Sequence, residues 1–113
     1  MIAEPLRKLV DGTPADLGLV GVITAVNPQA IRNALKGGQV PVISPIAIDE
    51  DFRGGLNVNA DIAAAAIAGA LDASVLIIMT DVAGIYRNWP DTSSLIAEIS
   101  AIELFELKNG FSE

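Results

Sequence analysis

Two neighbouring apolar segments in the middle of the chain constrain the fold most. Residues 60–71 (ADIAAAAIAGAL) have the composition of a helix that is apolar on almost every side, and residues 75–80 (VLIIMT) form an uninterrupted apolar run. Such a helix must be covered on several sides, and such a run is typical of a strand in the middle of a parallel sheet. Because alanine side chains and Gly69 let other backbone segments approach closely, the pair predicts an α/β fold with helices packed on a buried sheet.

The segment before this pair shows turn and helix signals at short intervals. Leu6–Val10 and Gly18–Ala25 flank the turn signal Asp11-Gly12-Thr13 and predict a β-hairpin. Asn27-Pro28 then predicts the start of a helix, because Asn is a good N-cap and Pro suits the first turn. This helix is expected to carry one apolar stripe and to end at two glycines, and the residues concerned are Ala30, Ile31, Ala34, Leu35, Gly37 and Gly38.

The remaining segments complete an alternation of strands and helices. Val40–Ser44 predicts a short strand, and Asp49–Gly55 predicts an exposed, solvated acidic hairpin tip. Further along, Leu95–Ile99 predicts a short extended segment, and Ser100 predicts the cap of a last helix over about 101–108. Strand, helix, strand, helix, strand is the order of a doubly wound α/β layer.

Composition narrows the chemistry that these 113 residues offer. They contain no Cys and no His, so a disulfide framework, a Cys/His zinc site and His-dependent nucleophilic catalysis are excluded. The formal net charge is −7 and the seven basic residues are scattered, which disfavours nucleic-acid binding and a basic membrane-surface helix. The runs Ile62–Leu71 and Val75–Thr80 are too short to cross a bilayer, and the first residues lack a signal-peptide pattern. We therefore expect a cytoplasmic protein with no membrane partner.

Two polar segments lie where ligands bind in open α/β sheets, beyond the carboxyl ends of strands. The first is Asn57-Val58-Asn59-Ala60-Asp61, at the start of the alanine-rich helix. A helix N-terminus presents unpaired N–H groups and a partial positive charge that attract anions. Asn57 adds an amide that can donate and accept hydrogen bonds, and Asp61 could position lysines brought from elsewhere. The structural alternative is that Asn59 is a helix cap and Asp61 a first-turn carboxylate, with no ligand.

The second segment is the loop after the apolar run. Asp81 follows Thr80, and Gly84 stands three residues further on. An Asp after an apolar strand with a nearby Gly is common in nucleotide-binding α/β proteins, and it is equally common as turn chemistry. The residues alone leave both interpretations open.

Four stretches together resemble one family. GLVGVITAVNPQAI, VPVISPIAID, LNVNADIAAAAIAGALDAS and VLIIMTDVAGIYRNWPDTSSLIAEIS follow one another in this order. From about Leu17 to Leu107 the chain resembles the acetylglutamate kinases of the amino-acid kinase family, and Asn-Val-Asn-Ala-Asp is the most specific part. The resemblance implies an α/β fold, a three-layer αβα sandwich with a mainly parallel sheet, of which this chain is an incomplete part. About 1–72 would end the substrate-binding half and about 73–113 would begin the nucleotide-binding half.

The resemblance also implies an activity. It is the transfer of the γ-phosphoryl group of ATP, bound with Mg²⁺, to the side-chain carboxylate of N-acetyl-L-glutamate in arginine biosynthesis, by a homo-oligomeric enzyme. Carried over residue by residue, Asn57 matches the asparagine that binds acetylglutamate, and Asp61 matches the catalytic aspartate that orients the catalytic lysines. The loop that contacts ATP is matched by Asp81, Val82, Ala83, Gly84, Ile85 and Tyr86. No protein ligand to a metal is implied.

Parts of the family's pattern have no match in these residues. A glycine-rich first strand with one catalytic lysine, a Gly-Gly substrate loop and a substrate-binding arginine are not recognisable, and the segment of the second lysine is expected just after Glu113. We therefore expect a central part of the enzyme that is inactive alone. Two alternatives stay open: a non-catalytic binding or assembly protein with the same fold, and a kinase for another small carboxylate.

Overall fold

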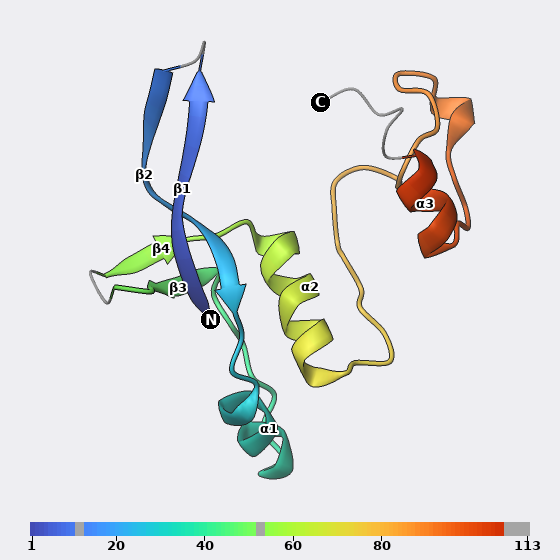
Figure 1. Ribbon diagram of the computed structural model, residues 1–113. Coiled ribbons are helices and arrows are strands. Elements are labelled where there is room, and N and C mark those ends of the chain that lie inside the picture. The colour runs from blue at the N-terminus through green and yellow to red at the C-terminus, as the bar shows by residue number, and fades with distance from the viewer. Residues whose placement is uncertain (11–12, 52–53, 108–113) are drawn as a thin grey trace. The chain divides into compact units, whose positions relative to one another are not determined.

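The computed structural model describes residues 1–10, 13–51 and 54–107, and the chain divides into two compact units, 1–78 and 79–113. The described part of the first unit contains β1 (Ile2–Val10), β2 (Thr13–Ala25), α1 (Gln29–Lys36), β3 (Ile46–Asp49), β4 (Gly55–Asn57) and α2 (Ala60–Leu71). That of the second contains a 3₁₀ turn, η1 (Thr92–Ser94), and α3 (Ala101–Leu107) (Figure 1). In the described ranges, no helix is long and apolar enough to span a membrane.

The four strands close on themselves in the order β1–β2–β4–β3. Two antiparallel hairpins, β1–β2 and β3–β4, are joined by short parallel contacts, Ile2 with Ile48 and Val20 with Asn57. The α/β class is confirmed, and the sheet is mixed. The predicted hairpin of the first 25 residues is confirmed with longer strands, although the turn residues Asp11 and Gly12 lie outside the described residues.

The acidic hairpin tip between β3 and β4 is also confirmed, with one exception to its predicted solvation. Glu50 and Asp51 are exposed, but the side chain of Asp49 is only 5% exposed. Its Oδ1 accepts a hydrogen bond from the Asp51 N–H at 2.8 Å, and its N–H donates to the Gly54 carbonyl at 3.0 Å. Because the Asp49 carboxylate accepts a hydrogen bond from the backbone of the turn, it can be buried at a lower cost than a carboxylate without a hydrogen bond.

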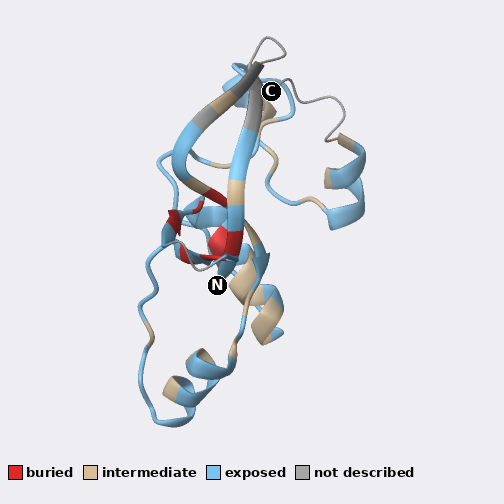
Figure 2. Cartoon of the chain, turned by 60° about the vertical axis from the view of Figure 1, so that its left-hand side comes forward, coloured by how far each residue is buried: buried red, intermediate tan, exposed pale blue. Residues whose placement is uncertain are grey.

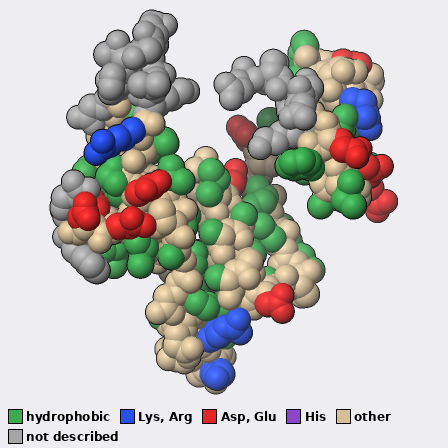
Figure 3. All heavy atoms as spheres, in the orientation of Figure 1, with side chains coloured by type: hydrophobic (Ala, Val, Ile, Leu, Met, Phe, Trp, Pro, Cys, Tyr) green, Lys and Arg blue, Asp and Glu red, His purple; other side chains and the backbone are tan. Residues whose placement is uncertain are grey.

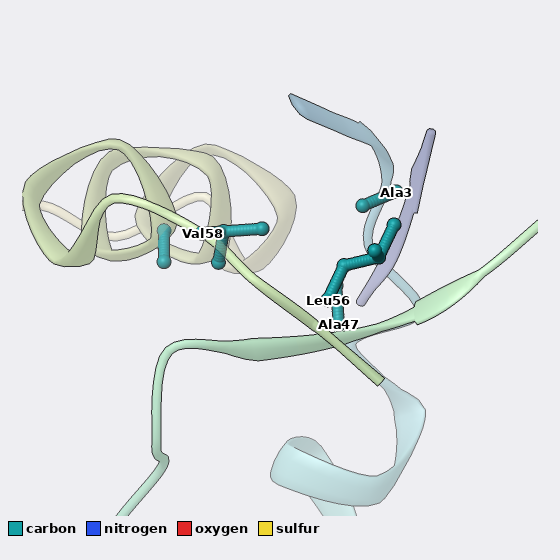
Figure 4. Close-up of a cluster of buried hydrophobic side chains, with 5 residues drawn as sticks. Ala3, Ala47, Leu56 and Val58 are labelled. Carbon is teal, nitrogen blue, oxygen red and sulfur yellow. The ribbon is translucent and has the colours of Figure 1, made fainter. Parts of the chain in front are cut away.

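A small core lies where the strands meet the start of α2. Figure 2 shows that the buried residues gather in this region. They are Ala3, Ala47, Leu56, Val58 and Ala63, and Figure 4 shows Leu56 beside Ala3 and Ala47. Gly21 of β2 lets the strands approach so closely: a Cβ at that position would lie 2.9 Å from Leu56 Cβ and 3.1 Å from Ala3 Cβ.

The three predicted helices are confirmed, because each is delimited by local signals. The N-cap of α1 is Pro28 rather than the predicted Asn27, although Asn27 Oδ1 accepts from the Gln29 N–H at 3.0 Å. Gly38 follows α1 with φ 73°. Ser100 and Glu103 form a capping box at the start of α3, in which the Ser100 N–H donates to Glu103 Oε2 at 2.9 Å. Lys108, at the expected end of α3, lies outside the described residues.

Two predicted strands are wrong. Neither Val40–Ser44 nor Val75–Thr80 is a strand in the structure, and their side chains stay largely exposed: Val42 is 96%, Ile77 78% and Met79 93% exposed. An apolar sequence can favour a strand, but only a neighbouring strand supplies the hydrogen bonds that make it one. Among the described residues, no segment lies beside either run to complete such a ladder.

Candidate functional site

The segment that enters α2 alternates between buried and exposed side chains. Leu56 and Val58 are 3% and 7% exposed, whereas Asn57 and Asn59 lie on the surface. Asn57 pairs with Val20 of β2 on one side and with Ile46 of β3 on the other. The Val58 N–H donates to the Pro45 carbonyl at 3.0 Å. The backbone that carries the Asn57 amide is thus held by the sheet, while the amide itself faces outward.

Asn59 starts α2 as predicted. Its Oδ1 accepts from the Ile62 N–H at 3.0 Å, and its carbonyl accepts from the Ala63 N–H at 2.9 Å. Asp61 is exposed in the first turn. The amides of Ala60 and Asp61 precede the first intrahelical hydrogen bond, so the helix end retains donors and a partial positive charge.

Asn57 and Asp61 differ from Asn59 in that their side chains bond to none of the described residues. In the described part of the chain, no hydrogen-bond partner is found for the Asn57 amide or the Asp61 carboxylate. A polar ligand or another charged group could therefore bind either of them without displacing an internal contact. Asn59 caps the helix and Asp61 lies in its first turn, so the structural interpretation accounts for both of these residues and leaves the exposed Asn57 unexplained.

The opposite end of α2 is tied to α1 by a contact that we did not predict. Asp72 ends the helix in a left-handed conformation with φ 56° and ψ 48°. The carbonyls of Ala70 and Leu71 both accept from Nη2 of Arg32 in α1, at 3.3 and 3.2 Å. One feature indicated that a basic residue from elsewhere could bind this end of α2: the last turn of the helix has no basic residue of its own. The sequence could not indicate which residue supplies it.

One face of α2 lines an apolar hollow of about 340 Å³. The helix contributes Ala60, Ala64, Ile67, Ala68 and Leu71, which follow one another at helical spacing. Pro41, Ile43 and Pro45 also line the hollow. Hydrophobic side chains are visible on the surface along α2 and the segment after it (Figure 3). The expectation that this helix needs cover on several sides is therefore met only in part by the described residues.

The second candidate segment, Asp81 to Tyr86, lies in the other unit. Asp81 is exposed, with Thr80 Oγ1 donating to its Oδ1 at 3.5 Å, and the Val82 N–H donates to Thr80 Oγ1 at 3.5 Å. Gly84 has φ 152°, and a Cβ there would lie 3.2 Å from Leu95 Cδ1. Glycine therefore suits both the backbone angle and the contact with Leu95.

The rest of this loop is organised by hydrogen bonds. Tyr86 forms an isolated antiparallel bridge with Leu95, and its ring centroid lies 5.3 Å from that of Trp89. Asp91 accepts from the Ser93 N–H at 2.9 Å and from the Ser93 hydroxyl at 2.6 Å. These two bonds favour the charged carboxylate, so the pKa of Asp91 is lowered from its ordinary value. Hydrogen bonds within the turn thus fix the conformation of the loop after residue 85. Of the predicted extended segment 95–99, only its first residue, Leu95, forms a β-bridge.

The described residues show no preformed metal centre. No group of three or more Asp, Glu, His or Cys side chains among them is placed to hold a metal ion. The structure describes Asn57 and Asp61 in one unit and Asp81 to Tyr86 in the other, and each candidate segment is therefore characterised within its own unit.

Comparison with known proteins decides the family. The family model described as "Amino acid kinase family" matches residues 5–113. The chain belongs to the amino acid kinase family. This amino acid kinase chain is 54% identical over 104 residues to the acetylglutamate kinase of Arthrobacter sp. (strain FB24), an alignment that covers 88% of the chain and 34% of that relative.

Other relatives of this amino acid kinase chain carry the same name. The acetylglutamate kinase of Leifsonia xyli subsp. xyli (strain CTCB07) is 53% identical over 90% of the chain and 34% of the relative. That of Rhodococcus jostii (strain RHA1) is 48% identical over 88% of the chain and 32% of the relative. The chain thus spans about a third of the length of the curated relatives that it matches.

Proposed function

We propose that these residues form part of an acetylglutamate kinase, which transfers the γ-phosphoryl group of ATP to the side-chain carboxylate of N-acetyl-L-glutamate in arginine biosynthesis. A carboxylate oxygen attacks the γ-phosphorus, the bond to the β-phosphate oxygen breaks, and an acyl phosphate and ADP are released. Family membership supports phosphoryl transfer, and the shared name of relatives that are 48–54% identical supports this acceptor.

One observation carries the assignment of residues: Asn57 and Asp61 are both exposed, and their side chains bond to none of the described residues, beside a helix N-terminus whose cap is Asn59. In the proposed site, the Asn57 amide binds N-acetyl-L-glutamate from the rigid end of β4. Asp61 orients the catalytic lysines that neutralise the phosphoryl group, and the open amides of α2 favour the anionic substrates. Catalysis rests on holding two anions in line, since the phosphoryl transition state needs little covalent help.

The nucleotide side of the proposal rests on the second unit. We assign Asp81, Val82, Ala83, Gly84, Ile85 and Tyr86 to the contact with ATP. Mg²⁺ would come bound to the nucleotide and would supply charge neutralisation there, with no protein ligand assigned to it. For the whole protein we propose a three-layer αβα sandwich with a mainly parallel sheet, divided near residue 72 into substrate and nucleotide halves. We further propose a homo-oligomer in the cytoplasm.

A hybrid enzyme tests this function. In the Arthrobacter relative, the 104 matched residues are replaced by those of this chain, and ATP-dependent phosphorylation is measured with N-acetyl-L-glutamate, L-glutamate and L-aspartate as acceptors. The proposal expects activity that prefers N-acetyl-L-glutamate. A folded hybrid that prefers another acceptor would support a kinase for a different small carboxylate, and a folded hybrid without any activity would support a non-catalytic role.

Two substitutions in the hybrid test the assigned roles. Asn57→Ala should raise KM for N-acetyl-L-glutamate more than it lowers kcat, because it removes a substrate contact. Asp61→Asn keeps the shape and should lower kcat by about a hundredfold, because the lysines lose their orientation. Asn33→Ala on α1 and Asp72→Asn at the far end of α2 are the matched controls, and both should leave the kinetics unchanged. The same pattern in Asn57→Ala and Asp61→Asn would refute the separate roles.

A further inference from the structure

The contact between Arg32 and α2 reaches the proposed site through the helix itself. α2 is fixed at its N-terminal end by Val58 and Ala63, both buried in the core. At its other end, Nη2 of Arg32 bonds to two carbonyls, those of Ala70 and Leu71. Arg32 comes from α1, 38 residues earlier than Ala70, so this contact joins α2 to a separate element.

We propose that Arg32 is a positioning residue for Asp61, acting by setting the tilt of α2; this inference rests on the proposed function. A guanidinium at the helix C-terminus satisfies carbonyls that have no intrahelical partner and opposes the negative end of the helix dipole. The Arg32 contact thereby holds the end of the helix that the core does not.

The geometry of α2 explains why a change in its tilt would displace Asp61 but not Asn57. From Ala63 to Leu71 the helix rises about 12 Å, so a shift of about 2 Å at Leu71 tilts α2 by roughly 10° about its buried end. A carboxylate at the helix surface lies about 6 Å from that pivot, so the same tilt moves Asp61 by roughly 1 Å. Asn57 precedes the helix and is paired with β2 and β3, so it stays in place.

This asymmetry predicts a specific kinetic result. A misplacement of about 1 Å at a catalytic group can cost up to about a hundredfold in rate. In the hybrid enzyme, Arg32→Ala should therefore lower kcat by about tenfold or more while KM for N-acetyl-L-glutamate changes by less than about twofold. Arg32→Lys keeps a cation near the carbonyls and should recover part of the rate. Lys36→Ala, which removes another exposed cation of α1, is the matched control and should change neither constant.

A double-mutant cycle separates positioning from loss of folded enzyme. If Arg32 acts through Asp61, Arg32→Ala should add less than about a twofold effect in the Asp61→Asn background. An equal loss of kcat in both backgrounds would overturn the inference, and so would an unchanged kcat in the single variant. If Asp61→Asn alone keeps the parental rate, the proposed function fails at that residue, which is a distinguishable result.

Amide hydrogen exchange provides a second test that does not depend on activity. Measured on the hybrid, Arg32→Ala should speed exchange at Asp72 and Ala73, whose N–H groups bond to the carbonyls of Gly69 and Ala68 at the end of α2. The Val58 amide, held by Pro45, should keep its parental rate. Uniform acceleration at both places would indicate global destabilisation and would overturn the inference.

Discussion

Replacing Gly21 by alanine should destabilise the first unit through a steric conflict. The residue is buried in β2, and a Cβ there would lie 2.9 Å from Leu56 Cβ, 3.0 Å from Leu56 Cδ1 and 3.1 Å from Ala3 Cβ. Two of these three neighbours are Cβ atoms, which are fixed by their own backbones and cannot rotate away. β2 must therefore move away from β1 and β4 to admit one methyl group.

The magnitude follows from the overlap. Ordinary contact begins at 3.4 Å, so the closest approach is too short by about 0.5 Å. Forcing one extra carbon into a packed core typically costs about 1–3 kcal/mol of folding free energy. Gly69 provides the matched control, because it lies in α2 with nothing within 4 Å of its added Cβ. Gly69→Ala should stabilise by about 0.5–1 kcal/mol through helix propensity.

Urea unfolding followed by far-UV circular dichroism measures both variants in the hybrid enzyme, where this unit belongs to a longer domain. The two substitutions should move the midpoint in opposite directions. The partner in the conflict can be tested as well: in a Leu56→Gly background, Gly21→Ala should cost less, because both Leu56 atoms are removed and only the contact with Ala3 Cβ is left of the three. If Gly21→Ala leaves the midpoint unchanged, or if its cost is the same in both backgrounds, the close packing of β2 on Leu56 is refuted.

Three further predictions concern the second unit and the chain as a whole. Hydrogen bonds from Ser100 lower the pKa of Glu103, so the capping box stabilises α3 above the ordinary glutamate pKa and the contribution is lost as pH falls through the lowered one. In the hybrid enzyme, NMR should show loss of the first turn of α3 in that range, and Ser100→Ala should abolish the dependence. The 113-residue chain alone should not phosphorylate N-acetyl-L-glutamate, because neither lysine expected from the resemblance is matched; ADP release above a no-acceptor blank would contradict this. Because Val75, Ile77 and Met79 are 70–93% exposed and charge repulsion is screened beyond about 8 Å, the chain should self-associate. Sedimentation of a single compact 11.7 kDa species at low micromolar concentration would show otherwise.

The helices were predictable because their signals are local. Asn59 bonds three residues ahead and Ser100 does the same, so a short window of sequence contains both partners of each cap. The same holds for the hairpins, whose strands are joined by short turns. In each case the interaction that defines the element lies within the stretch that predicts it.

The two strand predictions that are wrong, for residues 40–44 and 75–80, failed for the opposite reason. Val75–Thr80 has the composition of a central strand, yet a strand also needs a neighbour, and composition contains no information about which segment lies beside it. The parallel contacts that close the sheet, such as Ile2 with Ile48, were likewise beyond a local pattern, because they join residues far apart in the chain.

Part of the candidate site was predictable from the sequence. The role of Asn59 as a cap and the position of Asp61 in the first turn follow from the motif itself. The link from Arg32 to the end of α2 does not, since many exposed cations could satisfy two free carbonyls and only the fold selects one. A sequence can indicate that a helix end needs a donor without indicating where the donor comes from.

The alternation at Leu56, Asn57 and Val58 has a consequence for how this segment can vary in length. Two buried side chains flank one exposed amide, and strand geometry turns every successive residue to the opposite face. One inserted or deleted residue between Gly55 and Asn59 would therefore turn the amide into the core and an aliphatic side chain into solvent at the same step. In a library of single-residue insertions and deletions, this short stretch should be as intolerant as the core itself, even at positions where many substitutions of exposed side chains are accepted.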